Sequence, residues 1–174
     1  MNLKTQKRNA AFKTASKSER AVMVAKDALK MLNAGKTRAE TGQWVNLEYT
    51  PEIYEEVQIC DVSDGFKECS VCALGALMLS EIRHTNKLKM SDVGYEIAYQ
   101  EHGHRLNKLF SKSQQKLMEL VFEGGMGLFG VRYLEEDELA KIDRFYCAYE
   151  DDEGRLRAIL KNVIKNNGKF VLPA

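Results

Sequence analysis

Apolar residues recur at spacings of three and four over most of the chain, which is the pattern of α-helices with one buried face. The clearest early stripe is Val22, Ala25, Leu29 and Leu32, and Asn33-Ala34-Gly35 predicts the end of that helix. We expect further helices over residues 111–123, 134–149 and 156–165. Only two prolines interrupt the chain, so long helices are permitted almost everywhere.

The run from Glu68 to Arg83 is apolar around nearly its whole circumference. A helix of this kind belongs at the centre of a domain, where other helices enclose it. Gly75 within it would cost about 1 kcal/mol relative to alanine, which is tolerable if another backbone must pass close to that position. We therefore predict a mainly α fold, a single compact helical domain built around a buried central helix at residues 68–83.

Two short segments have the residues of extended chain. Residues 44–47 contain Trp44 and Val45, and residues 169–172 follow Gly168, which ends the last predicted helix. We expect the two segments to pair as a small two-stranded ribbon that brings the ends of the domain together. The predicted organisation is a basic, flexible N-terminal arm at residues 1–17 and one helical domain at residues 18–174.

Charge excludes some classes of partner. The formal net charge is +1, which argues against a protein that binds nucleic acid through bulk electrostatics. The charge is unevenly distributed along the chain. The first twenty residues are basic, whereas residues 135–153 carry nine acidic residues against Lys141 and Arg144. A solvated arm and solvated helix faces explain both features, and nucleic-acid binding by the basic arm is the alternative.

The N-terminal sequence has no apolar segment of the kind found in signal peptides, and the longest apolar run, residues 71–79, is far too short to span a membrane. Four cysteines without a secretion signal are typical of a reducing compartment. We expect a cytoplasmic protein with no membrane contact. Whether it forms a homo-oligomer is left open.

Cys69 and Cys72 have the spacing of a CxxC motif. A dithiol redox site requires that motif between a strand and a helix, whereas the preceding residues 63–68 suggest a polar loop. A zinc site would need two further ligands, for which the candidates are Cys60, Cys147 and the pair His102 and His104. Buried free cysteines are common and inert, so we interpret the pair as packing residues and expect no bound metal and no cofactor.

Two other motifs suggest a ligand site. Residues 125–130 match GxGxxG, but a predicted helix precedes them, so we interpret them as a glycine loop over a pocket rather than a dinucleotide site. The pair His102 and His104 lies beside a carboxylate and an arginine. Aromatic and cationic groups suit a flat anionic ligand. The predicted ligand-binding residues are Trp44, Arg83, His84, His104, Arg105, Gly125 and Gly127.

In four blocks, taken in order, the chain resembles a family of short uncharacterised bacterial and phage proteins. The blocks are ERAVMVAKDALKML, CSVCALGALMLS, LFSKSQQKLMELVFEG and RLRAILKNVIKNNGKFVLP. Members of the family have a central CALGAL helix and a glycine–aromatic ending after the last helix. The resemblance implies an all-α module in an accessory-genome setting, and it carries over no catalytic residue.

These observations favour a non-enzymatic binding module. We expect a phage or mobile-element accessory factor that binds a host protein or sequesters a small anionic signalling ligand. The alternative is a small metal-dependent or hydrolytic enzyme that uses His102, His104 and the Cys69/Cys72 pair.

Overall fold

The computed structural model of the protein describes residues 3–49, 66–85, 103–124 and 134–173. Helices make up most of these residues, beside a small three-stranded sheet. The elements in chain order are α1 (Leu3–Thr14), α2 (Lys17–Asn33), β1 (Arg38–Ala39), β2 (Val45–Tyr49), β3 (Phe66–Val71), α4 (Ala73–Thr85), the 3-10 helix η2 (Gly103–Lys108), α6 (Lys112–Glu123), α7 (Glu136–Cys147) and α8 (Asp152–Lys165).

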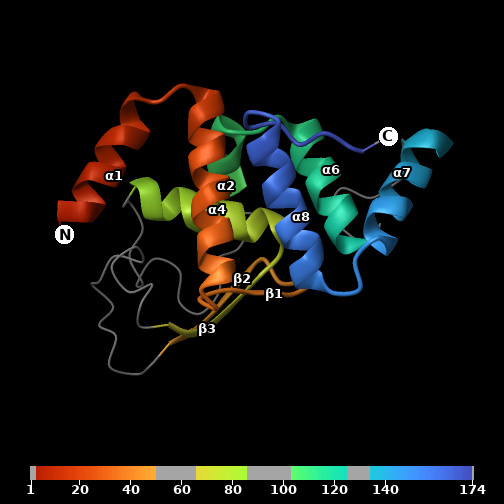
Figure 1. Ribbon diagram of the computed structural model, residues 1–174, viewed down its shortest axis with the longest axis horizontal. Coiled ribbons are helices and arrows are strands. Elements are labelled where there is room, and N and C mark those ends of the chain that lie inside the picture. The colour runs from red at the N-terminus through yellow and green to blue at the C-terminus, as the bar shows by residue number, and fades with distance from the viewer. Residues whose placement is uncertain (1–2, 50–65, 86–102, 125–133, 174) are drawn as a thin grey trace.

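Helix α4 is the centre of the fold. All ten residues from Ala73 to Ile82 are buried, and α1, α2, α6, η2 and the strands β2 and β3 all pack against it. In Figure 1, α4 crosses behind α2, with the sheet below both helices. The prediction of a mainly helical fold around a buried central helix is therefore confirmed.

The predicted start of the central helix is wrong. Residues 68–71 belong to the strand β3, and α4 begins only at Ala73. Strand β3 lies in the middle of the sheet, parallel to β1 and antiparallel to β2. The strand is favoured because β1 and β2 form hydrogen bonds with the backbone of β3 on both of its sides. The spacing of apolar residues within residues 68–71 does not indicate these partners.

The predicted ribbon is also wrong in its pairing. Residues 45–49 form β2, but their partner is β3, with Val45 opposite Val71 and Leu47 opposite Cys69. Residues 169–172 form no strand. Instead the Asn162 side chain accepts a hydrogen bond from the Val171 amide (2.9 Å) and donates one to the Val171 carbonyl (2.8 Å). One asparagine thereby takes the place of a partner strand.

The predicted helix ends are largely confirmed. Helix α2 ends at Asn33, as expected, and it begins at a capping box between Ser16 and Glu19. Ser111 caps α6 by accepting a hydrogen bond from the Gln114 amide at 3.2 Å. The first turn of α7 is acidic, which complements the positive end of the helix dipole.

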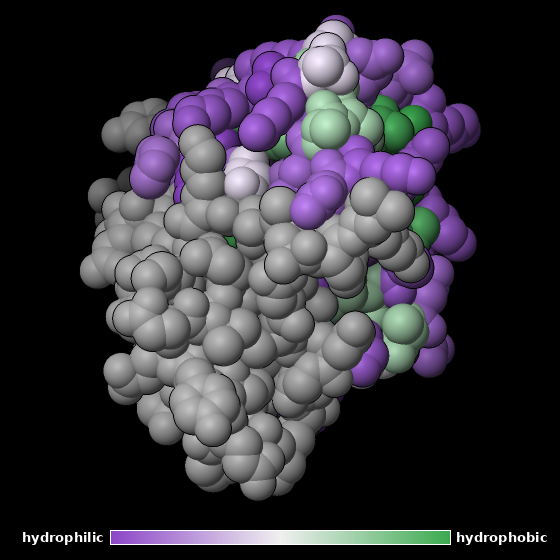
Figure 2. Space-filling model, turned by 90° about the vertical axis from the view of Figure 1, so that its left-hand side faces the viewer, coloured by the Kyte–Doolittle hydropathy of each residue, from purple (hydrophilic) through white to green (hydrophobic). Residues whose placement is uncertain are grey.

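The N-terminal helix α1 contacts α4. Its Phe12 is buried, and the ring centroid lies 4.9 Å from that of His84. Figure 2 shows the face of the molecule on the left-hand side of Figure 1. The described part of this face is mainly hydrophilic, with isolated apolar groups between the polar ones. The division into an arm at residues 1–17 and a domain at residues 18–174 stays a prediction. No helix within the described ranges combines the length and the apolarity needed to cross a membrane.

Candidate functional site

Arg83 and Arg105, two of the predicted ligand-binding cations, lie near the C-terminal end of α4, but carboxylates already engage them. The Nε of Arg83 donates to Asp27 Oδ2 at 2.9 Å, and the Ser80 hydroxyl donates to the same oxygen, also at 2.9 Å. The Nε of Arg105 donates to Glu81. Both guanidinium groups therefore tie helices together, and their charge is compensated inside the protein.

The predicted histidines differ in environment. His84 is buried, and its Nδ1 lies 2.8 Å from the Ser80 carbonyl oxygen. Burial lowers the pKa of His84, which favours the neutral ring at physiological pH. His104 is exposed in η2.

Trp44 is not part of the same cluster. Its carbonyl oxygen lies over Gly75, and Arg83 is eight residues further along α4, about 12 Å at the rise of an α-helix. Gly125, Gly127 and His102 lie outside the described residues. The structure thus brings Arg83, His84 and Arg105 to one end of α4 and places Trp44 near the other.

The two cysteines of the CxxC motif do lie at a strand–helix junction, because the preceding segment is β3 rather than the predicted loop. Both thiols are free and buried. Burial raises the pKa of Cys69 and of Cys72 to about 12, which keeps them protonated and unreactive. The Cys72 sulfur accepts a hydrogen bond from the Gly75 amide at 3.4 Å and so caps the first turn of α4. Over the described ranges, no group of three histidine, cysteine or acidic side chains is arranged to hold a metal ion.

The loop between β1 and β2 is fastened by two carboxylates. The Gly42 amide donates to Glu123 Oε2 at 2.9 Å, while Asp152 Oδ2 accepts from the Thr41 amide (2.7 Å) and hydroxyl (2.8 Å). Burial raises the pKa of Glu123 to about 7, although the hydrogen bond from the Gly42 amide lowers it, and the neighbouring Glu119 adds to the increase. Glu123 therefore titrates near neutral pH while it holds the loop.

The raised pKa of Glu123 predicts that the stability of the folded protein depends on pH. Its folded pKa of about 7 exceeds the usual 4.5, so the folded chain binds the proton more tightly than the unfolded chain. The resulting stabilisation is complete below pH 4.5 and is lost as the pH rises towards 7. Glu123→Gln, which keeps an oxygen acceptor for Gly42, should raise the free energy of unfolding at pH 8 by about 1–2 kcal/mol.

Urea unfolding of both proteins between pH 4.5 and 8 measures this effect. The exposed Glu150→Gln is the matched control, and we expect it to follow the wild-type pH profile. An identical pH slope for Glu123→Gln and the wild type would refute the assignment.

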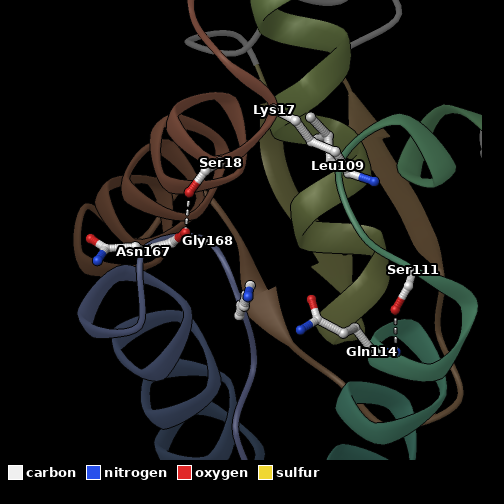
Figure 3. Close-up of a pocket in the computed structure, with 8 residues that line it drawn as sticks. Lys17, Ser18, Leu109, Ser111, Gln114, Asn167 and Gly168 are labelled. Atoms are coloured by element: carbon white, nitrogen blue, oxygen red, sulfur yellow. Dashed lines mark hydrogen bonds between the residues drawn. The ribbon is translucent and has the colours of Figure 1, made fainter.

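A separate cavity of about 300 Å³ lies where three segments meet. Figure 3 shows it between the start of α2, the start of α6 and the turn after α8, with α4 behind. The lining residues are Lys17, Ser18, Leu109, Ser111, Gln114, Asn167, Gly168 and Lys169. Its size is at the lower end of the range for small-molecule sites.

Close packing fixes one wall of this cavity. The Ser18 hydroxyl donates to the Asn167 carbonyl, and the Gly168 amide donates to the Val163 carbonyl at 2.8 Å. Gly168 has a φ of +85°, and a Cβ there would lie 2.6 Å from the Ser18 carbonyl oxygen. Only glycine allows the turn after α8 to approach α2 this closely.

The cavity has a positive lining. Lys17 and Lys169 are its charged residues, and no acidic residue lines it. In the part of the chain that the structure describes, neither lysine makes an ion pair and the Gln114 side chain makes no hydrogen bond. The helices α2 and α6 both begin here. The N-terminus of α6 contributes about half a positive charge from its dipole, whereas the Glu19 carboxylate of the capping box offsets that of α2. The end of α8 contributes the opposite sign, so the positive charge of the lining comes mainly from the two lysines.

Sequence reasoning missed this cavity. The helix starts at Ser16 and Ser111 and the stop at Gly168 are visible in the sequence, and each is a local signal. Their convergence at one place depends on the antiparallel packing of α8 against α2, which joins residues about 150 positions apart.

Comparison of the chain with protein-family models, with curated proteins and with solved structures finds no match in any of the three. The resemblance drawn from the four sequence blocks therefore stays a prediction.

Proposed function

We propose that this protein is a non-enzymatic binding module that holds a small anionic ligand in the cavity between α2, α6 and α8. The observation that carries the proposal is the pair of uncompensated lysines, Lys17 and Lys169, beside two helix N-termini. Ammonium groups and helix N-termini are the groups that proteins use for phosphate and carboxylate. The hydroxyl of Ser111 and the amide of Gln114 add polar groups that can orient a ligand.

Two arguments favour binding over catalysis. The cavity lining contains no histidine, cysteine or acidic residue that could act as a nucleophile or a general base. The thiols required by the enzymatic alternative are buried and, with pKa values of about 12, protonated. We therefore propose a binding module rather than an enzyme. From the sequence, we also propose that it acts as a cytoplasmic accessory factor of a phage or mobile element.

Isothermal titration calorimetry tests the cavity with defined probes: inorganic phosphate, succinate and adenosine monophosphate. We expect at least one of them to bind with a Kd below about 1 mM at low salt. The double variant Lys17→Gln/Lys169→Gln should weaken that binding at least about tenfold, because each lost charged hydrogen bond is worth about 1.5–3 kcal/mol. Both side chains lie on the surface, so the fold should be unaffected.

The matched control is Lys161→Gln/Lys165→Gln, which removes two exposed lysines of α8 that do not line this cavity. It should bind the probe as the wild type does. Equal losses in both double variants would indicate only a general charge effect. Absence of binding for every probe at 10 mM would remove the cavity as the functional site.

A further inference from the structure

A second hollow lies on the other side of α8, between that helix, the end of α7 and the C-terminal tail. Its volume is about 410 Å³. Figure 1 shows the tail running from the end of α8 towards α7. The groove has an apolar floor and a basic wall. The apolar part is Phe145, Tyr149, Ala158 and Pro173, and the basic part is Arg157, Lys161 and Lys165.

Defined contacts hold the groove in shape. The ring of Phe145 packs against Tyr149 with centroids 5.3 Å apart and against Phe170, edge to face, at 5.9 Å. The Asn162 side chain fixes Val171 through two hydrogen bonds. Val171 is 49% exposed and is the large hydrophobic residue that the described surface leaves most open to solvent. The groove is thus a preformed surface, and the exposed Val171 lies in the tail two residues before the lining residue Pro173.

The basic wall follows one face of α8. Arg157, Lys161 and Lys165 are spaced by four residues, so they extend over about 12 Å of helix. Arg157 is partly compensated by Glu153 at 3.7 Å. Lys161 and Lys165 are exposed, and neither forms an ion pair with the other described residues. The uncompensated positive charge lies at the C-terminal half of the helix.

No acidic residue lines the groove, but the chain beside its Tyr149–Gly154 end is acidic. Glu150 and Asp151 precede α8, and Glu153 lies in its first turn. A long polyanion such as a nucleic acid would be attracted at one end and repelled at the other. A short acidic segment avoids that repulsion if its carboxylates lie at Lys161 and Lys165. The charge pattern therefore favours a protein segment over a nucleic acid.

We propose that this groove binds a short, extended, acidic segment of a partner protein that carries one aromatic or aliphatic side chain. About four or five extended residues span the basic wall at roughly 3.3 Å per residue. The apolar side chain contacts Phe145, Tyr149 and Pro173, and the carboxylates pair with Lys161 and Lys165. This inference is independent of the anion cavity, because the two sites share no lining residue.

NMR titration of the ¹⁵N-labelled full chain tests the proposal. The probe is an acetylated peptide of about six residues with a central phenylalanine flanked by glutamates. We expect chemical-shift changes at the backbone amides of residues 154–165 and 170–172. The same peptide with alanine in place of phenylalanine should bind at least about threefold more weakly, because it loses the apolar contact. Changes confined to other parts of the chain would overturn the proposal.

Fluorescence anisotropy with the labelled peptide then compares variants. Lys161→Gln/Lys165→Gln should weaken binding at least about fivefold, whereas Lys17→Gln/Lys169→Gln should leave it unchanged. Equal effects in the two variants would contradict the assignment to the groove. Tighter binding of an oligothymidylate of equal charge would identify a polyanion as the occupant and overturn the proposal. Self-association that Lys161→Gln/Lys165→Gln abolishes would do the same in favour of a second copy.

Discussion

Gly75→Ala is expected to prevent the protein from folding. A Cβ at this position would lie 1.6 Å from the carbonyl oxygen of Trp44 and 2.6 Å from its carbonyl carbon. Both atoms are backbone, and the neighbouring Cys72 amide donates to the same oxygen at 3.3 Å. Neither the start of β2 nor the first turn of α4 can move without breaking the contact between the sheet and the central helix. We expect a loss of at least about 4 kcal/mol of the free energy of unfolding.

This expectation runs against helix propensity, which on its own would make alanine about 1 kcal/mol better than glycine. Gly154→Ala in α8 is the matched control. There the nearest contact of a Cβ is a side-chain atom, Asp151 Oδ1 at 3.0 Å, and the next is at 3.5 Å. Gly154→Ala should stay within about 1 kcal/mol of the wild type. Soluble expression and urea unfolding measure both, and a stably folded Gly75→Ala would show that the packing of β2 on α4 is described wrongly.

Arg105→Met is expected to destabilise the protein by about 3 kcal/mol. Arg105 donates from Nε to Glu81 and from a terminal nitrogen to the Thr85 hydroxyl at 2.6 Å, which links η2 to α4. The side chains are only 13% and 7% exposed for Arg105 and Glu81. Removing the arginine leaves the Glu81 carboxylate without a counter-charge and with little access to water. An isolated buried charge destabilises the folded state more than the buried ion pair does.

The double variant Glu81→Gln/Arg105→Met separates this explanation from a loss of packing. If the isolated carboxylate causes the destabilisation, the double variant should recover most of the lost free energy. Arg38→Met is the control, because Arg38 and Glu40 form an exposed pair at 3.3 Å, and such pairs are worth less than about 1 kcal/mol. No recovery in the double variant would mean that the methylene groups of Arg105, and not its charge, stabilise the structure.

Glycine and capping signals were the most informative parts of the sequence. The cost of Gly75 in the central helix is tolerable only if another backbone passes close, and the structure places the Trp44 carbonyl there. The helix ends near Asn33 and before Gly168 follow from local turn chemistry and are also confirmed. These features could be predicted because their causes lie within a few residues of each other.

The candidate sites could not be predicted in the same way. The sequence makes Arg83 and Arg105 attractive as ligand contacts, but their partners Asp27 and Glu81 are separated from them by 56 and 24 residues. Lys17 and Lys169, by contrast, lie in unremarkable basic segments. Which cations are compensated and which remain available is therefore a property of the packed structure.

The sequence by itself determined the helical periodicity, the burial of the central segment and the helix ends, because each depends on neighbouring residues along the chain. Only the tertiary structure decided that residues 68–71 form a strand, that β2 pairs with β3, and that α2, α6 and α8 meet around a positive cavity. Strand pairing and charge compensation join residues far apart in the chain, and their free energies depend on which groups the fold removes from water.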